Sequence, residues 1–232
     1  MVDLKDITLL TTNYNNKNMT LCMLMSYMKN VGLNANYLVI DNSDNINESV
    51  LKTDLNYFDN TFNHITHNYR QCSKNHCSAV DYAFKNLIKT RYVMLCDNDI
   101  FFKPSIIELL EDYKNYDCIG EIGWDDAPPT RIFPYLNIID LQKFKEDGIN
   151  YFDINRIIEA PPIGRHIGPR GPNTKCWYHD TGSSFYEDIK NKWNIKEIKL
   201  SDYIIHHKVT MSSAAQLKDF IEKYKYMWVL EN

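Results

Sequence analysis

The chain has 232 residues, 44% of them hydrophobic, and a formal net charge of -4 at pH 7. This length predicts one globular domain with a buried core, and the scattered Lys and Arg residues disfavour a nucleic-acid partner. No segment reaches the ~18 uncharged apolar residues of a membrane span, and Met1 to Asp6 carry no apolar signal core. We therefore expect a soluble, cytoplasmic protein with no signal peptide and no transmembrane segment.

The cysteines are widely spaced and include no Cys-x-x-Cys pair. Most of them lie in apolar segments, which favours reduced thiols in the core. They are Cys22, Cys72, Cys77, Cys96, Cys118 and Cys176.

The first elements alternate between strand and helix. Ile7 to Thr12 is typical of a strand, and a helix follows a polar turn, extends to about Val31 and is closed by Gly32. Tyr37 to Ile40 indicates a second strand, which ends in Asp41. In the helix we expect four apolar side chains to point inward: Leu21, Leu24, Met25 and Met28.

A third short strand is expected around Phe62 to Thr66, followed by a helix from about Ser73 to Asn86 and a strand from Tyr92 to Cys96. The helix is indicated by apolar residues at helical spacing, namely Cys77, Val80, Phe84, Leu87 and Ile88. The predicted order is therefore strand, helix, strand, strand, helix, strand.

The second half of the chain is less regular. Past Pro104 we expect a helix to about Lys114 and then a strand from Asp117 to Ile122. Two loops stand out, Gly123 to Pro129 and Ala160 to Thr174, and such loops are either substrate lids or plain surface excursions. The chain ends in an amphipathic helix from about Ser213, which we expect to pack on the domain through Leu217, Phe220, Ile221, Tyr224 and Trp228.

The segment Asp97-Asn98-Asp99 directly follows the apolar strand Tyr92 to Cys96. Side chains at i and i+2 of an extended segment point to the same side, so both carboxylates can converge on one divalent cation. A continuous apolar run indicates a strand of a parallel sheet, and such sheets bind ligands beyond their carboxyl ends. A solvated turn is the alternative, but the hydrophobic Ile100-Phe101-Phe102 after it disfavours a turn.

Four segments of the first half together resemble nucleotide-sugar-dependent glycosyltransferases of the GT-A fold, in particular those like glycosyltransferase family 2. They are Thr12-Asn13-Tyr14-Asn15, Val39-Ile40-Asp41-Asn42-Ser43, Ser73-Lys74-Asn75-His76-Cys77 with Val80-Asp81, and Asp97-Asn98-Asp99. Cys77 stands where the family has a glycine. In the second half, Tyr178-His179-Asp180-Thr181-Gly182 resembles the motif of the catalytic base, and His206-His207 resembles a late metal-binding histidine.

The resemblance implies an α/β fold of GT-A type, with a mixed, mostly parallel central sheet flanked by helices and a Rossmann-like nucleotide-binding half. Residues 1–117 would bind the nucleotide sugar and residues 118–232 the acceptor. The implied activity is a metal-dependent, inverting transfer of a hexosyl or deoxyhexosyl group from a UDP-, GDP- or dTDP-sugar to a hydroxyl of a glycan or glycoconjugate. The implied cofactor is Mn or Mg.

Site roles follow from the same resemblance. The metal ligands would be Asp97, Asp99 and one of the two histidines. Because adjacent side chains of a strand point to opposite sides, at most one histidine faces the metal, and we favour His207 over His206. Donor contacts are expected from Thr12, Tyr14, Asp41, Asn42, His76, Asp97 and Asn98, with Asp41 on the nucleotide base.

Asp180 is the expected general base, which would deprotonate the acceptor hydroxyl. The structural alternative is an ordinary helix N-cap, because Asp180 precedes Thr-Gly-Ser-Ser-Phe at a predicted helix start. Trp124, beside Asp125 and Asp126, is a weaker candidate for stacking on an acceptor sugar.

Other functions stay open. A non-catalytic nucleotide-sugar-binding module would keep the donor site without turnover, whereas a sugar-phosphate nucleotidylyltransferase would need a glycine-rich, basic loop that Asn13-Tyr14-Asn15-Asn16 does not supply. The carboxyl-terminal helix is also a candidate for peripheral contact with a membrane or a partner, since Lys218, Lys223 and Lys225 flank its apolar face.

Overall fold

The computed structural model describes residues 4–50, 57–59, 69–125, 127–151, 158–160, 176–178, 182–207 and 214–229. Its strands are β1 (Ile7–Asn13), β2 (Asn36–Asp41), β3 (Tyr57–Asp59), β4 (Tyr92–Cys96), β5 (Ile100–Phe102), β6 (Cys118–Asp125), β7 (Ala127–Asp140), β8 (Ile158–Ala160), β9 (Cys176–Tyr178), β10 (Ile195–Glu197) and β11 (Ile204–His206). The helices are α1 (Lys17–Val31), α2 (Tyr69–Tyr82), α3 (Ile106–Asp112), α4 (Leu141–Glu146), α5 (Ser183–Ile189), α6 (Leu200–Tyr203) and α7 (Ala214–Lys223). A π-helical turn at Ala83–Leu87 and single 3-10 turns at Tyr113–Asn115 and Lys225–Met227 extend α2, α3 and α7.

The central sheet is mixed and mostly parallel, as predicted. Its strand order is β10-β6-β7-β4-β1-β2-β3. The pairs β1 with β2, β1 with β4, β2 with β3 and β6 with β10 are parallel, whereas β7 runs antiparallel to both β4 and β6. Two small antiparallel sheets, β5 with β11 and β8 with β9, lie beside it. The carboxyl ends of β1, β2 and β4 therefore lie at one edge, where ligands of open α/β sheets bind.

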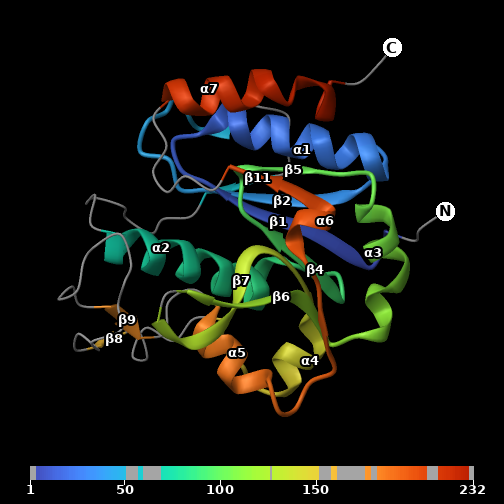
Figure 1. Cartoon of the computed structure of the whole chain (residues 1–232), viewed down its shortest axis with the longest axis vertical. Helices are drawn as coiled ribbons and strands as arrows, with labels where there is room; N and C mark the ends of the chain where they lie inside the picture. The colour runs from blue at the N-terminus through green and yellow to red at the C-terminus, as the bar shows by residue number, and fades with distance from the viewer. Residues whose placement is uncertain are drawn as a thin grey trace.

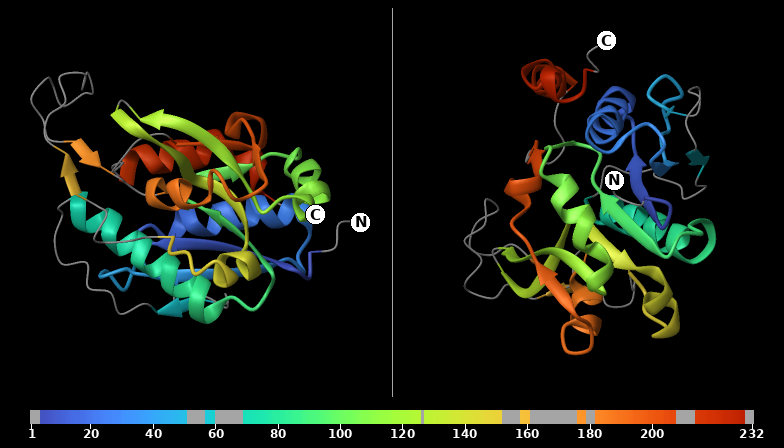
Figure 2. Two further views of the ribbon diagram at one scale, coloured as in Figure 1. Left: turned by 90° about the horizontal axis from the view of Figure 1, so that it is seen from below. Right: turned by 90° about the vertical axis from the view of Figure 1, so that its right-hand side faces the viewer.

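Helices cover both faces of the central sheet, with α1 and α7 on one side and α2, α4 and α5 on the other (Figures 1 and 2). Successive side chains of β1 alternate between these faces: Leu9 packs in the core beside α1, and Leu10 in the core beside α2. A strand buried on both faces needs an unbroken apolar sequence, which explains the apolar runs at β1 and β4.

The inward face of α1 differs from the prediction. Leu24 is buried, but Leu21, Met25 and Met28 are only partly buried, and the buried face is formed by Met19, Thr20, Cys22, Met23, Ser26 and Tyr27. Met23 and Tyr27 pack in the central core, while Met19 and Cys22 pack with residues of α7. Because α1 lies between the sheet and α7, it is covered on two sides, and periodicity alone could not identify a single inward stripe.

The loop predicted from Gly123 to Pro129 is wrong, because its residues up to Asp125 belong to β6 and those from Ala127 onward belong to β7. Asp125 of β6 pairs with Ala127 of β7, and Gly123 pairs with Arg131. A Cβ atom at Gly123 would lie 2.1 Å from the ring of Phe133, so a side chain at this strand position would displace that ring. Prolines suggested a break in the chain, yet strands tolerate proline where no ladder hydrogen bond is needed.

Several other predictions are confirmed. The helix around Cys77 has Cys77, Val80, Phe84 and Ile88 buried, with Leu87 partly buried.

Cys22, Cys77, Cys96 and Cys118 are buried free thiols, while the side chains of Cys72 and Cys176 are outside the described part of the chain. The strand expected at Phe62 to Thr66 falls outside the described residues, which do include a short strand slightly earlier, β3. Of the loop expected from Ala160 to Thr174, Ala160 ends β8, and residues 161–174 fall outside the described residues.

The carboxyl-terminal helix packs on the domain, as predicted. Phe220 stacks on Phe101 of β5 with the ring centroids 5.0 Å apart and the planes at 12°. Lys29 of α1 donates hydrogen bonds of 2.8 Å to the carbonyl oxygens of Tyr226 and Val229. The apolar face of α7 is thus occupied by intramolecular packing. Within the described residues, none of the helices combines the length and hydrophobicity that crossing a bilayer requires.

Candidate metal centre

The proposed metal motif lies in a short connection between two buried strands. Asp97, Asn98 and Asp99 join β4, which ends at Cys96, to β5, which begins at Ile100. Because β5 is fully buried and pairs antiparallel with β11, residue Ile100 lies opposite His206. This pairing brings a histidine from the far end of the chain to the two aspartates.

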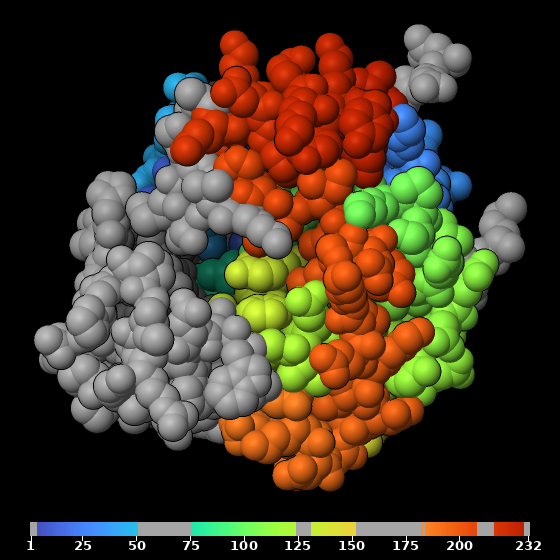
Figure 3. Space-filling model, in the orientation of Figure 1, coloured from blue at the N-terminus to red at the C-terminus, as the bar shows by residue number. Residues whose placement is uncertain are grey.

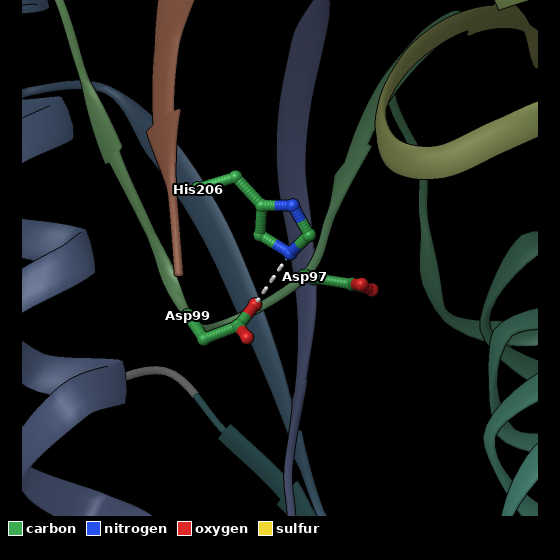
Figure 4. A group of neighbouring side chains, drawn as sticks. All are labelled: Asp97, Asp99 and His206. Carbon is green, nitrogen blue, oxygen red and sulfur yellow. Dashed lines mark ion pairs between the residues drawn. The ribbon is translucent and has the colours of Figure 1, made fainter. Parts of the chain in front are cut away.

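Asp97, Asp99 and His206 form a cluster of candidate metal ligands (Figure 4). One ligand atom from each residue lies within 4.8 Å of the others, and the Nε2 atom of His206 is 3.3 Å from the Oδ1 atom of Asp99. The side chains of His206 and Asp99 are 12% and 22% exposed, so a solute can reach them. Carboxylate oxygens with one imidazole nitrogen suit Mn, and carboxylates also suit Mg.

The two histidines point in different directions, as strand geometry requires. His206 faces Asp99, whereas the ring of His207 packs against Phe220 with the centroids 4.6 Å apart. The backbone N–H of His207 donates to the carbonyl oxygen of Asp99 at 3.0 Å. The geometry therefore favours His206 as the metal ligand, opposite to the preference for His207 drawn from the sequence.

Burial, together with a neighbouring negative charge, perturbs the ionisation of Asp97. Desolvation, followed by the nearby negative charge of Asp99, raises the pKa of Asp97 to about 7. His206 and Arg131 act in the opposite direction. Two carboxylates held this close repel each other unless a cation or a proton neutralises one of them.

Candidate donor residues lie at the same edge of the sheet, because β1 and β2 are parallel with Asn13 opposite Asp41. The hydroxyl of Thr12 lies 2.9 Å from the Nδ1 atom of His76, which links β1 to α2. Tyr14 is exposed, and its hydroxyl donates to Asp44 at 3.2 Å. Figure 3 shows a hollow near the middle of one face, with yellow atoms of β7 at its edge.

Asp41 is buried and fully engaged inside the chain. One carboxylate oxygen accepts from the Asn13 side chain at 3.3 Å and the Ser43 backbone at 2.9 Å, and the other from Ser49 at 2.7 Å and the Val50 backbone at 2.5 Å. Burial alone would raise the pKa of Asp41, but hydrogen bonds, chiefly from Ser43 and Ser49, hold it below its ordinary value. All of the roughly four acceptor positions of a carboxylate are thus used.

Sequence reasoning missed two polar residues close to this centre. Arg131 of β7 is 8% exposed, lies over the ring of Phe133 at 5.4 Å, and its charge acts on Asp97. Thr20 of α1 is fully buried and accepts a hydrogen bond of 2.9 Å from the Asn98 side chain. Neither residue had a local signal: Arg131 lies beyond the loop expected from Gly123 to Pro129, and the role of Thr20 depends on a contact 78 positions away.

Asp180 and the side chain of Trp124 lie outside the described residues. The helix after Asp180 is α5, and its N-cap residue is Gly182, with φ at 80°. The capping alternative for Asp180 stays a prediction, because its side chain lies outside the described residues. A Cβ atom at Gly182 would lie 2.2 Å from the carbonyl oxygen of Ile132, so glycine lets the start of α5 approach β7 closely.

Comparison with known proteins gives structural but not sequence relatives. No protein-family model matches the chain, and no curated protein matches it in sequence. S. aureus TarS 1–349, solved in complex with UDP-GlcNAc, is 13% identical with a TM-score of 0.51; the match covers 96% of this chain and 65% of TarS 1–349. The bifunctional glycosyltransferase WbbM, in its apo structure, is 11% identical with a TM-score of 0.50, over 94% of this chain and 44% of WbbM.

This chain therefore spans less than two thirds of the length of either protein. At such low identity the comparison establishes the fold alone. The strand order, the flanking helices and these matches agree: the protein has the GT-A type of glycosyltransferase fold.

Proposed function

We propose that this protein is a metal-dependent, inverting glycosyltransferase, which moves a sugar from a nucleotide diphosphate to a hydroxyl of a glycan or glycoconjugate. The observation that carries the proposal is the cluster of Asp97, Asp99 and His206 just beyond β4, in a fold shared with glycosyltransferases. Residues 1–117 would form the donor half and residues 118–232 the acceptor half.

The chain's own residues fit a divalent cation. Asp97, Asp99 and His206 would hold Mn or Mg, and such an ion, when bound, stabilises the negative charge of a departing diphosphate. His206 is placed by the pairing of β11 with β5, and the Asp99 carbonyl is fixed by the backbone of His207. Positioning by backbone hydrogen bonds is well suited to a site that must be formed before the substrate arrives.

Thr12, Tyr14, Asn42 and His76 are proposed donor contacts, because they lie at the edge where β1 and β2 end or on the adjoining helix α2. Asp97 completes this donor set, whereas Asp41 and Asn98, which the resemblance also implies, form hydrogen bonds inside the chain. UDP-, GDP- and dTDP-sugars are the candidate donors. Tyr14 presents an exposed aromatic ring, which suits stacking on a flat base.

Asp180 is the proposed general base for the acceptor hydroxyl. Its support is indirect: Gly182, two positions later, lies against Ile132, and the adjacent Arg131 acts electrostatically on Asp97. Helix α5 thus begins beside β7, the strand that carries Arg131. A carboxylate that is partly desolvated there can accept the hydroxyl proton.

The test has a binding stage and a transfer stage. Thermal shift with Mn and a panel of nucleotide sugars should reveal a donor that raises the melting temperature of the wild type and not of Asp99→Asn. Transfer is then measured with that donor and a glycan panel, and NMR of the product determines whether the anomeric configuration inverts. Donor binding without transfer to any acceptor or to water would instead identify a non-catalytic nucleotide-sugar-binding module.

A further inference from the structure

A continuous chain of side-chain hydrogen bonds runs from the metal motif into the interior. The Asn98 amide donates to the hydroxyl of Thr20 at 2.9 Å, and that hydroxyl donates to the Asn13 side-chain oxygen at 2.8 Å. Thr20 and Asn13 are both fully buried. The chain thus joins the loop after β4 to helix α1 and strand β1.

The same chain continues to the loop after β2. The amide nitrogen of Asn13 donates to the hydroxyl of Ser43 at 2.8 Å, to the Glu48 carbonyl at 3.0 Å and to Asp41 at 3.3 Å. Asp41 in turn accepts from Ser49 and from the backbone of Val50. The metal motif and the loop of residues 42–50 are therefore tied to one buried hub, Asn13.

Thr20 is the critical connection, because its single hydroxyl both accepts from Asn98 and donates to Asn13. The same hydroxyl also lies 3.1 Å from the carbonyl oxygen of Asn16. Asn98 stands between Asp97 and Asp99 in the chain, so holding its side chain restricts the backbone that aims both carboxylates. Hydrogen bonds made directly to metal ligands typically contribute ~10-fold or more to metal affinity, and Thr20 acts one residue further out, through the backbone that Asn98 shares with both aspartates.

We propose that Thr20 is a positioning residue for the metal centre, and that Asn98 and Asp41 act through this hydrogen-bonded network. This inference rests on the proposed function, because it assumes that Asp97 and Asp99 bind a divalent cation. It assigns to Asn98 and Asp41 a role in organising the site, in place of the direct ligand contacts implied by the resemblance. Metal binding and the shape of the loop of residues 42–50 are then linked through Asn13.

The experiment titrates the full chain with Mn alone, by calorimetry, and compares three variants. Thr20→Val keeps the shape of the side chain but removes the hydroxyl, and should weaken Mn binding by about 10-fold. Thr20→Ser keeps the hydroxyl and should restore binding to within about 2-fold of the wild type, an effect that packing alone would not produce. Thr8→Val is the matched control, because Thr8 lies on β1, away from its carboxyl end, and its hydroxyl is 2.8 Å from that of Thr90. It should lose stability but bind Mn normally.

A second route covers the case in which Thr20→Val does not fold. Asn98→Ala removes the donor at the other end of the same hydrogen bond and should weaken Mn binding to a similar extent. If Thr20→Val does fold, the double variant should bind no more weakly than either single variant.

Two results separate the inference from the proposed function. Failure of the wild type to bind Mn would overturn both. Normal Mn binding by the wild type, with equal affinity in Thr20→Val or Asn98→Ala, would overturn the positioning role and leave the proposed function intact.

Discussion

Asp99→Asn tests the metal centre because the structure predicts opposite effects on the metal-free and metal-bound protein. Asparagine keeps the shape of the side chain, and the backbone hydrogen bond from His207 to residue 99 does not involve the carboxylate. The substitution also removes one of the causes that raise the pKa of Asp97, the negative charge of Asp99. The metal-free variant should therefore melt at or slightly above the temperature of the wild type.

The metal-bound proteins should differ clearly. Mn at ~100 times its dissociation constant stabilises the wild type by about 2.7 kcal/mol. For a chain of this size, 1 kcal/mol raises the melting temperature by about 2–4 °C, so we expect a rise of roughly 5–10 °C. The variant loses one of three ligands and its charge, so the same Mn concentration should raise its melting temperature by no more than about 1 °C.

Calorimetric melting with and without Mn is the assay, and His206→Gln provides a second ligand variant. If Asp99 instead stabilises the fold as an ion-pair partner of His206, the metal-free Asp99→Asn protein should melt several degrees lower and the wild type should not respond to Mn. That pattern would refute the metal site. An equal Mn response in both proteins would remove Asp99 from the ligand set.

Three further predictions follow from the same structure. Mn affinity should fall as the pH is lowered from 8 to 6, because the pKa of Asp97 is raised to about 7 and its carboxyl must lose a proton to bind metal. A constant Mn affinity in calorimetric titrations over this pH range would contradict that expectation. Phe220→Ala should lower the free energy of unfolding by about 3 kcal/mol in urea titrations, because Phe220 is buried against Phe101 and His207. The control Tyr226→Ala, at a side chain that is 65% exposed, should change this free energy by less than about 0.5 kcal/mol. Equal losses in the two variants would contradict the observed packing of α7. Asp180→Asn should reduce turnover by about 100-fold at saturating donor and acceptor, with donor affinity and melting temperature nearly unchanged, since asparagine keeps the shape of the side chain and caps a helix about as well as aspartate. Near-normal turnover would move the search for the base to Asp125, Asp126, Glu187 or Asp188.

Local sequence pattern was sufficient to predict the elements that carry the aspartates. The apolar run before Asp97 required a strand buried on both faces, and the observed β4 has all five residues buried. The spacing of Cys77, Val80 and Phe84 placed them on one buried helical face, and that of Phe220 and Tyr224 predicted the apolar face of α7. These elements depend on the spacing of apolar residues over a few positions, and that spacing can be read from the sequence itself.

Pairing between distant segments of the chain decided which residues come together at the candidate metal centre. His206 and His207 are equivalent in the sequence, and only the pairing of β11 with β5 turns His206 toward Asp99 and His207 toward Phe220. The hydrogen bond between Thr20 and Asn98 joins residues 78 positions apart, and the hairpin of β6 and β7 brings Arg131 near Asp97. Strand register and side-chain contacts of this range depend on how the whole core packs. Local periodicity cannot encode them, and so the tertiary structure alone selected the histidine and the buried residues that hold the site.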